Sequence, residues 1–158
     1  ERLYSPLIRY ALSKLRSREL ATDLTQDVFM RVFEKIKAGQ VKEISKSYFF
    51  RSIQNSIIDH WRSKDRLVIR DEELIAKEAD RTGESMKTEN TGLLRAIKEE
   101  LGKLKDAERE AIELRYFGEL EIEEIADIMG KSEVAIRQLC SRGIKKIREN
   151  KSSIEKYL

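Results

Sequence analysis

Apolar residues recur at steps of three and four along most of this chain, which is the spacing of one face of an α-helix. Before the middle of the chain, this pattern predicts helices over about residues 2–17, 20–37 and 48–64. Gly39 is the expected end of the second helix, because glycine readily takes the left-handed conformation found there. Ser47 is the expected cap of the third helix. The positions expected to be buried are Leu7, Ile8, Ala11, Leu12, Leu15, Leu24, Val28, Val32, Ile36, Phe50, Ile53, Ile57 and Trp61.

The periodicity weakens over residues 67–92, which contain RTGESMKTENTG, a polar run that we interpret as part of a linker. Beyond it, the spacing predicts helices over about residues 93–103, 106–117, 121–129 and 132–149. Strong helix formers are abundant, and Pro6 is the single proline. We therefore predict an all-α chain of two small helical domains joined by a linker.

The last two predicted helices have the pattern of a DNA-reading helix-turn-helix. Small Ala126 lets a second helix cross closely, and Gly130 can take the positive φ that the tight turn needs. Ser132 is a natural N-cap for the second helix. Such a helix lies in the major groove, with its early residues at base edges and its later cations at phosphates. The expected contact residues are Ser132, Glu133, Val134, Arg137, Gln138, Ser141, Arg142, Lys145 and Lys146, while Ile136, Leu139, Cys140 and Ile147 are expected to face inward.

Composition argues against several classes of protein. A single Cys and a single His, without C-x-x-C spacing, exclude an internal disulfide and argue against a structural zinc site. The apolar runs are short, so we expect no membrane insertion, and no secretory signal is visible, which favours the cytoplasm. No P-loop pattern is present, and we predict no cofactor and no metal.

The charge of the chain is unevenly distributed. Residues 1–66 hold 14 Lys and Arg against 8 Asp and Glu, and residues 131–158 hold 8 against 3. The chain between them is acidic, with a net charge of −3 over residues 67–92 and −5 over residues 93–130. Two basic zones separated by acidic chain indicate two contacts with a polyanion.

Three motifs agree with one known family. The segments DLTQDVFMRVFEKI (23–36) and YFFRSIQNSIIDHWRSK (48–64), followed by the helix-turn-helix, resemble bacterial sigma factors of the extracytoplasmic-function group. These are minimal sigma factors that hold only regions 2 and 4. The resemblance implies region 2 over residues 1–66, a linker over 67–92, and region 4 over 93–158 with a winged-helix-like helix-turn-helix. It also implies a non-enzymatic protein that binds core RNA polymerase and directs promoter-specific transcription initiation.

For region 2, the resemblance assigns two sets of contacts. A polar stripe on the helix at 20–37 is implied to dock on the clamp coiled coil of the largest polymerase subunit, since carboxylates suit a protein partner better than DNA. This stripe consists of Asp23, Gln26, Asp27, Arg31 and Glu34. The following loop and helix are implied to bind the unpaired strand of the −10 element, with cations along phosphates. This set consists of Val41, Lys42, Lys46, Arg51, Asn55, Arg62, Lys64 and Arg66, whereas Phe49, Phe50 and Trp61 are expected to pack in the core.

For region 4, the resemblance implies that the recognition helix reads the −35 element, with Arg137 and Gln138 at bases and the later cations on the DNA backbone. The segment LRYFG (114–118) lies near the groove that, in the family, packs on the flap tip of the second-largest subunit. The family also implies an anti-sigma factor as a further partner.

Two other readings remain open. A stand-alone helix-turn-helix regulator explains residues 93–158 equally well but leaves the two earlier motifs unexplained. A small nuclease or recombinase needs acidic residues that bind Mg²⁺ beside a nucleophile, and no such pair is evident. The chain also departs from the family pattern at Lys131, Ala135 and Leu139, so the promoter bases cannot be transferred from relatives.

Overall fold

The computed structural model describes residues 2–68, 91–150 and 155. The prediction of an all-α fold is confirmed, because the described ranges consist of helices and short connections without a strand. The chain divides into two compact units, Glu1–Ser85 and Met86–Leu158. The predicted linker falls almost entirely outside the described residues. Among the helices that are described, none has the length and apolar character needed to cross a lipid bilayer.

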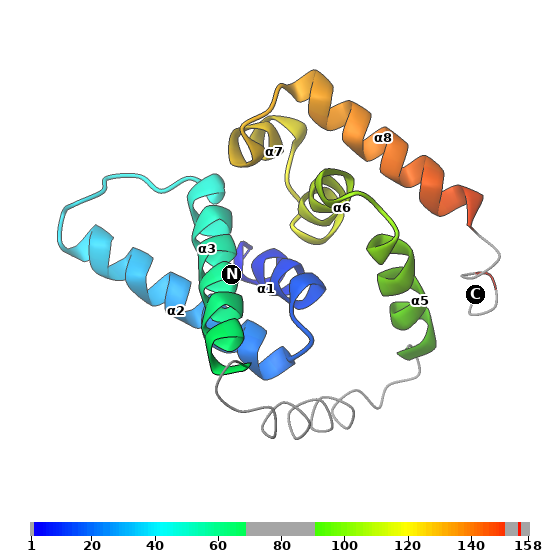
Figure 1. The fold of residues 1–158 in the computed structure, drawn as a ribbon. Coiled ribbons are helices and arrows are strands. Elements are labelled where there is room, and N and C mark those ends of the chain that lie inside the picture. Colours follow the sequence, from blue (N-terminus) through cyan, green and yellow to red (C-terminus); the bar gives the residue numbers. More distant parts are fainter. Residues whose placement is uncertain (1, 69–90, 151–154, 156–158) are drawn as a thin grey trace. The chain divides into compact units, whose positions relative to one another are not determined.

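The first unit is built from α1 (Tyr4–Lys14), α2 (Arg18–Lys37) and α3 (Lys46–Val68), each of which packs on the other two (Figure 1). Tyr10 and Phe50 meet edge to face at 5.5 Å between ring centres, and Gln54 donates a hydrogen bond to the Tyr10 hydroxyl. Both rings are therefore buried without leaving the phenol unsatisfied. The core consists of Leu7, Tyr10, Ala11, Leu15, Ala21, Val28, Val32, Phe50, Ile53 and Ile57.

Local capping sets the ends of α1 and α2. The predicted first helix was too long, because Leu15 is extended and the hydroxyl of Ser17 accepts the amide of Leu20 to begin α2. At the other end of α2, Gly39 has a φ of 69°, and its amide donates to Ile36 while the next amide donates to Lys35. This pair of bonds is the Schellman arrangement that closes a helix, so the prediction for Gly39 is confirmed.

The prediction that Ser47 caps α3 is wrong. The helix begins two residues earlier than predicted, at Lys46, and the hydroxyl of Ser45 accepts the amide of Tyr48 at 3.3 Å. Ser47 is instead buried. Phe49 is half-buried against Phe29, with 4.9 Å between ring centres, as expected for a packing residue.

Two residues predicted to be buried are exposed. Ile36, in the last turn of α2, is 48% exposed, and Trp61, toward the end of α3, is 43% exposed. The buried stripe of α2 instead includes Thr25, whose hydroxyl donates to the carbonyl of Ala21 at 2.7 Å. A threonine whose hydroxyl bonds to a carbonyl of its own helix can be buried at little cost. Residue polarity alone therefore did not fully predict which side of α2 is buried.

The second unit contains α5 (Thr91–Gly102), α6 (Asp106–Ile112), the π-helical turn η1 (Glu113–Phe117), α7 (Ile122–Met129) and α8 (Glu133–Glu149). One part of its core is formed by Leu101, Leu104 and Ile112, with Ile97, Phe117, Ile144 and Ile147 packed against them. The helix predicted at 106–117 is present as α6, which continues into the π-helical turn η1. A hydrogen bond from the amide of Gly118 to the carbonyl of Glu113, at 3.1 Å, closes this turn.

The packing of α8 on α6 depends on Gly143. This residue is buried, and a Cβ atom placed on it would collide with Cδ1 of Ile112 and lie 3.3 Å from Cγ1 of the same side chain. The missing side chain therefore lets the two helices approach closely. Since Gly143 lies on the inner side of α8, this contact determines which side of α8 faces outward.

We predict that Gly143→Ala destabilises the second unit by up to about 2 kcal/mol. Overpacking costs about 1–3 kcal/mol, which exceeds the gain of about 1 kcal/mol from replacing a helical glycine. Hydrogen exchange of the amides of α6 and α8 measures the change. In an Ile112→Val background, which lacks the colliding methyl group, the same substitution should be neutral or stabilising. An equal cost in both backgrounds would show that the crossing is not limited by this contact.

Candidate nucleic-acid interface

The turn between α7 and α8 has the geometry expected of a helix-turn-helix. Gly130 has a φ of 62°, and its amide donates to the carbonyl of Ala126, as does the amide of Lys131 at 3.1 Å. The hydroxyl of Ser132 accepts the amide of Ala135 at 3.1 Å and begins α8. The predicted roles of Gly130 and Ser132 are both confirmed.

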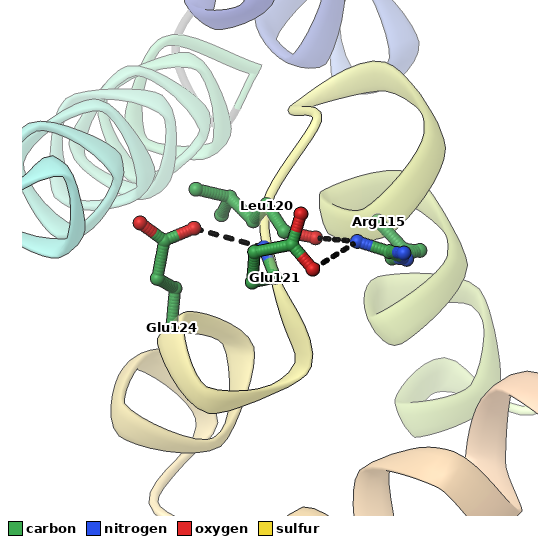
Figure 2. A network of polar contacts seen from close by, with 4 residues as sticks. All are labelled: Arg115, Leu120, Glu121 and Glu124. Carbon is green, nitrogen blue, oxygen red and sulfur yellow. Dashed lines mark hydrogen bonds and ion pairs between the residues drawn. The ribbon is translucent and has the colours of Figure 1, made fainter.

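A polar network holds the start of α7 to the helix before it (Figure 2). One guanidinium nitrogen of Arg115 donates to the carbonyl of Leu120 at 2.7 Å and to the carboxylate of Glu121 at 3.1 Å. The amide of Glu121 in turn donates to the carboxylate of Glu124 at 2.8 Å, forming a capping box. Two carboxylates of the acidic stretch at 119–124 therefore serve to position the first helix of the motif.

The outward face of α8 carries nearly all of the residues predicted for DNA contact. Ile136 is fully buried, and Leu139, Cys140 and Ile147 are all half-buried on the inner side of the helix or at its border. The prediction that these four residues face inward is thus met, most fully by Ile136. The exposed residues of the predicted set are Ser132, Glu133, Val134, Arg137, Gln138, Ser141, Arg142 and Lys145, whereas Lys146 is half-buried.

Arg137 is oriented by its neighbour in the free protein. Its guanidinium lies 3.1 Å from the carboxylate of Glu133, one turn earlier, and both side chains are largely exposed. An exposed pair of this kind contributes less than about 1 kcal/mol. Arg137 can therefore exchange Glu133 for a base or a phosphate at little energetic cost.

Lys146 differs from the other predicted contact residues. Its ammonium binds both carboxylate oxygens of Glu108 in α6, at 2.7 and 3.1 Å, and the side chain of Glu108 is only 5% exposed. The hydrogen bond and charge of Lys146 lower the pKa of Glu108 below its ordinary value, against the burial that raises it. The ammonium of this lysine therefore joins α8 to α6 within the unit.

The second unit also has an open groove of about 420 Å³, which periodicity did not predict, although the family resemblance placed the segment 114–118 near a groove. Tyr116 of the π-turn and Ile144 of α8 contribute apolar surface, and Lys145 and Arg148 contribute charge. Cys140 lines the same groove, and burial raises the pKa of its thiol despite the nearby Arg115, so it stays neutral. The π-turn explains why periodicity did not find this groove, because the additional residue in the turn shifts the side chains that follow.

In the first unit, α3 brings most of the predicted nucleic-acid residues to one face. Arg51, Asn55 and Arg62 are all exposed and share this face, with Arg66 one turn further on. Lys64 is exposed as well but lies about 160° around the helix from Arg62, so α3 does not bring it together with the others. The predicted residues at the loop are Val41, which is half-buried, with Lys42 and Lys46, which are exposed.

The exposed face of α2 carries the polar stripe predicted for a protein partner, together with an apolar centre that was not predicted. Gln26, Asp27 and Glu34 are exposed, and so is Asp23. Met30 and Phe33, at 59% and 64% exposure, lie on the same side of the helix as Gln26. Their positions four and seven residues after Gln26 would have revealed them on a helical projection. Met30 and Phe33 were not predicted to lie on this face, because apolar residues are expected to be buried.

Arg31, which was predicted to belong to that stripe, reaches across to α3. Its guanidinium donates to the hydroxyl of Ser56 at 2.6 Å and to the carbonyl of Asp27 at 3.4 Å. Beside it, a pocket of about 320 Å³ is lined by residues of α2, α3 and the loop between them, including Tyr48, Ser52 and Gln40. Arg31 therefore joins the two helices at the wall of this pocket. In the part of the chain that the structure describes, no group of three or more acidic, His or Cys side chains is arranged to hold a metal ion.

Comparison with known proteins relates both units to one family. A family model for sigma-70 region 2 matches residues 1–67, and one for sigma-70 region 4 matches residues 101–149. The chain is 26% identical over 140 residues to the RNA polymerase sigma factor SigV of Bacillus subtilis, covering 89% of this chain and 81% of that protein. It is 29% identical over 143 residues to the ECF RNA polymerase sigma factor BldN of Streptomyces coelicolor, covering 87% of this chain and 53% of that protein.

A solved structure has the same fold. The sigma factor RpoE of Bartonella quintana, in complex with the anti-sigma factor NepR, superposes with a TM-score of 0.61 at 22% identity. The match covers 94% of this chain and 91% of that one.

We predict that the Glu108–Lys146 pair makes the stability of the second unit depend on pH. Because the pKa of Glu108 is lowered in the folded state, its contribution is present above the unfolded pKa, near 4.3, and is lost as pH falls through the folded pKa. Lys146→Met should therefore lower the stability by about 1–3 kcal/mol at pH 7, and by less at pH 4. Denaturation followed by circular dichroism across this range measures the difference.

Arg142→Met is the matched control, because Arg142 lies one turn earlier on α8 and is exposed. It should change the stability by less than about 0.5 kcal/mol. A deficit of Lys146→Met that stays constant from pH 7 to pH 4 would contradict the assignment.

Proposed function

This chain belongs to the sigma-70 family, in the extracytoplasmic-function group, and on that premise we propose that it binds core RNA polymerase and directs transcription initiation to specific promoters. The observation that carries the proposal is the presence of region 2 together with region 4. A regulator that binds only duplex DNA needs a helix-turn-helix and has no use for the exposed faces of α2 and α3.

The surface for the −35 element is the outward face of α8. Its first two turns present Glu133, Val134, Arg137 and Gln138, which are in the place where a recognition helix meets base edges. The later residues Ser141, Arg142 and Lys145 suit the phosphates, which set affinity more than sequence choice. Lys146 is left out of this surface, because its charge is used within the domain.

The surface for the −10 element is the face of α3 that holds Arg51, Asn55 and Arg62, with the loop at 41–46 beside it. Unpaired DNA needs cations along its phosphates and aromatic or polar surface for its bases. The pocket lined by Tyr48, Ser52 and Gln40 provides such surface next to the loop. We place the captured base there, and the phosphates along the arginines.

The surface for core polymerase is the exposed face of α2. Met30 and Phe33 form an apolar centre, and Asp23, Gln26 and Asp27 surround it with polar groups. An apolar centre with a polar rim is the usual anatomy of a protein interface. It fits the clamp coiled coil, while the groove at Tyr116 and Ile144 fits the flap tip.

The proposal includes two broader statements. The protein is non-enzymatic, since its role is to position the polymerase, and it acts in the cytoplasm, where that enzyme works. An anti-sigma factor is a further proposed partner, because the structurally similar RpoE was solved with one.

We predict that two sets of substitutions separate the two binding activities. Arg137→Ala should weaken promoter-specific transcription about tenfold or more, the loss expected for one base contact, while core affinity stays near normal. Gln26→Ala combined with Asp27→Ala should instead weaken core affinity. Titration of labelled core polymerase and transcription at saturating protein measure the two properties. If both variants lose the same property to the same degree, the assignment of surfaces is wrong.

We also predict that the apolar centre of α2 dominates the contact with core polymerase. Met30→Ala and Phe33→Ala should each weaken core binding about tenfold, as truncation of a central interface residue does. Ile36→Ala is the control for Met30→Ala, because Ile36 is exposed but lies about 120° around the helix from Met30. A chain that binds promoter duplex without binding core at all would instead support the stand-alone regulator.

A further inference from the structure

Val134 is an exposed apolar side chain at the start of the outward face of α8, a helix that the structure describes in full. It is 61% exposed and lies in the first turn, directly after the Ser132 cap. Single exposed apolar residues are common on protein surfaces, so exposure alone assigns no role. The position of Val134 and the chemistry around it are what distinguish it.

The side chain of Val134 is held in place before any ligand binds. The bond from Ala135 to the Ser132 hydroxyl fixes the backbone of this turn. A β-branched residue in a helix strongly prefers one χ1 rotamer, so the two methyl groups have nearly fixed positions. Little side-chain entropy is then lost when the methyl groups contact a partner.

The surroundings of Val134 favour DNA over a protein surface. Arg137 and Gln138 are three and four residues further along α8, and Arg142 and Lys145 lie beyond them. An apolar group among cations and an amide suits a base edge flanked by phosphates. In the major groove, the apolar group on a base edge is the C5-methyl of thymine, while the other edges offer hydrogen-bond donors and acceptors.

We propose that Val134 selects thymine at one position of the −35 element by packing its methyl groups against the C5-methyl. This rests on the proposed function. Any other base would leave polar groups facing valine without a hydrogen-bond partner, which is unfavourable. Since Gln138 is one turn away, at about 5–6 Å between Cβ atoms, it would meet a base within about two steps of that thymine.

Deoxyuridine tests this proposal, because it pairs as thymine does but lacks the C5-methyl. Holoenzyme is assembled from core polymerase and the full chain, and its dissociation constants are measured on promoters in which each −35 thymine is replaced in turn. At one position, the replacement should weaken binding about fourfold, the effect of one buried methyl group. For Val134→Ala, the same replacement should have no effect.

Gln138→Ala is the matched control. It should weaken binding to both templates while keeping the fourfold ratio between them, because separate contacts contribute additively. The proposal is overturned if no thymine gives a ratio above one, or if Val134→Ala keeps the ratio. Loss of core affinity in Val134→Ala with the ratio retained would assign the residue to a protein contact. Failure to bind any promoter with core polymerase would overturn the proposed function as well.

Discussion

The close crossing of α8 over α6 at Gly143 is the contact on which the recognition surface depends. With no side chain at this position, Ile112 fills the space between the helices. Lys146, one turn later, binds the buried Glu108 and prevents α8 from rotating about that crossing. One side of α8 is thereby fixed inward, so the opposite side, with Arg137 and Gln138, must face solvent. The promoter contacts that we propose for the second unit depend on this geometry.

The energy needed to open promoter DNA indicates that this chain acts together with a larger partner. Opening about ten base-pair steps costs on the order of 14 kcal/mol at about 1.4 kcal/mol per step. The chain has no P-loop pattern that would indicate nucleotide hydrolysis. A larger partner must therefore hold the DNA while the bubble opens. The exposed Met30 and Phe33, amid carboxylates that DNA would repel, are suited to such a protein partner.

Helix positions and the helix-turn-helix could be predicted because their signals are local. Gly39, Gly130 and Ser132 act through their own backbone and neighbouring amides, so sequence alone indicates their roles. The contacts of Lys146 and Arg31 within the units were not predicted, because their partners, Glu108 and Ser56, are distant in sequence and are met only through packing. The groove at Tyr116 depends on a π-turn that periodicity does not reveal. The burial of Thr25 and exposure of Trp61 likewise depend on tertiary packing.

Transcription from a pooled promoter library tests the central claim most directly. Purified chain is added to sigma-free core polymerase, and the 5′ ends of the RNA are sequenced. The account predicts RNA from a subset of templates that share one sequence near −35 and another near −10. RNA no different in amount or origin from that made by core polymerase alone would contradict it.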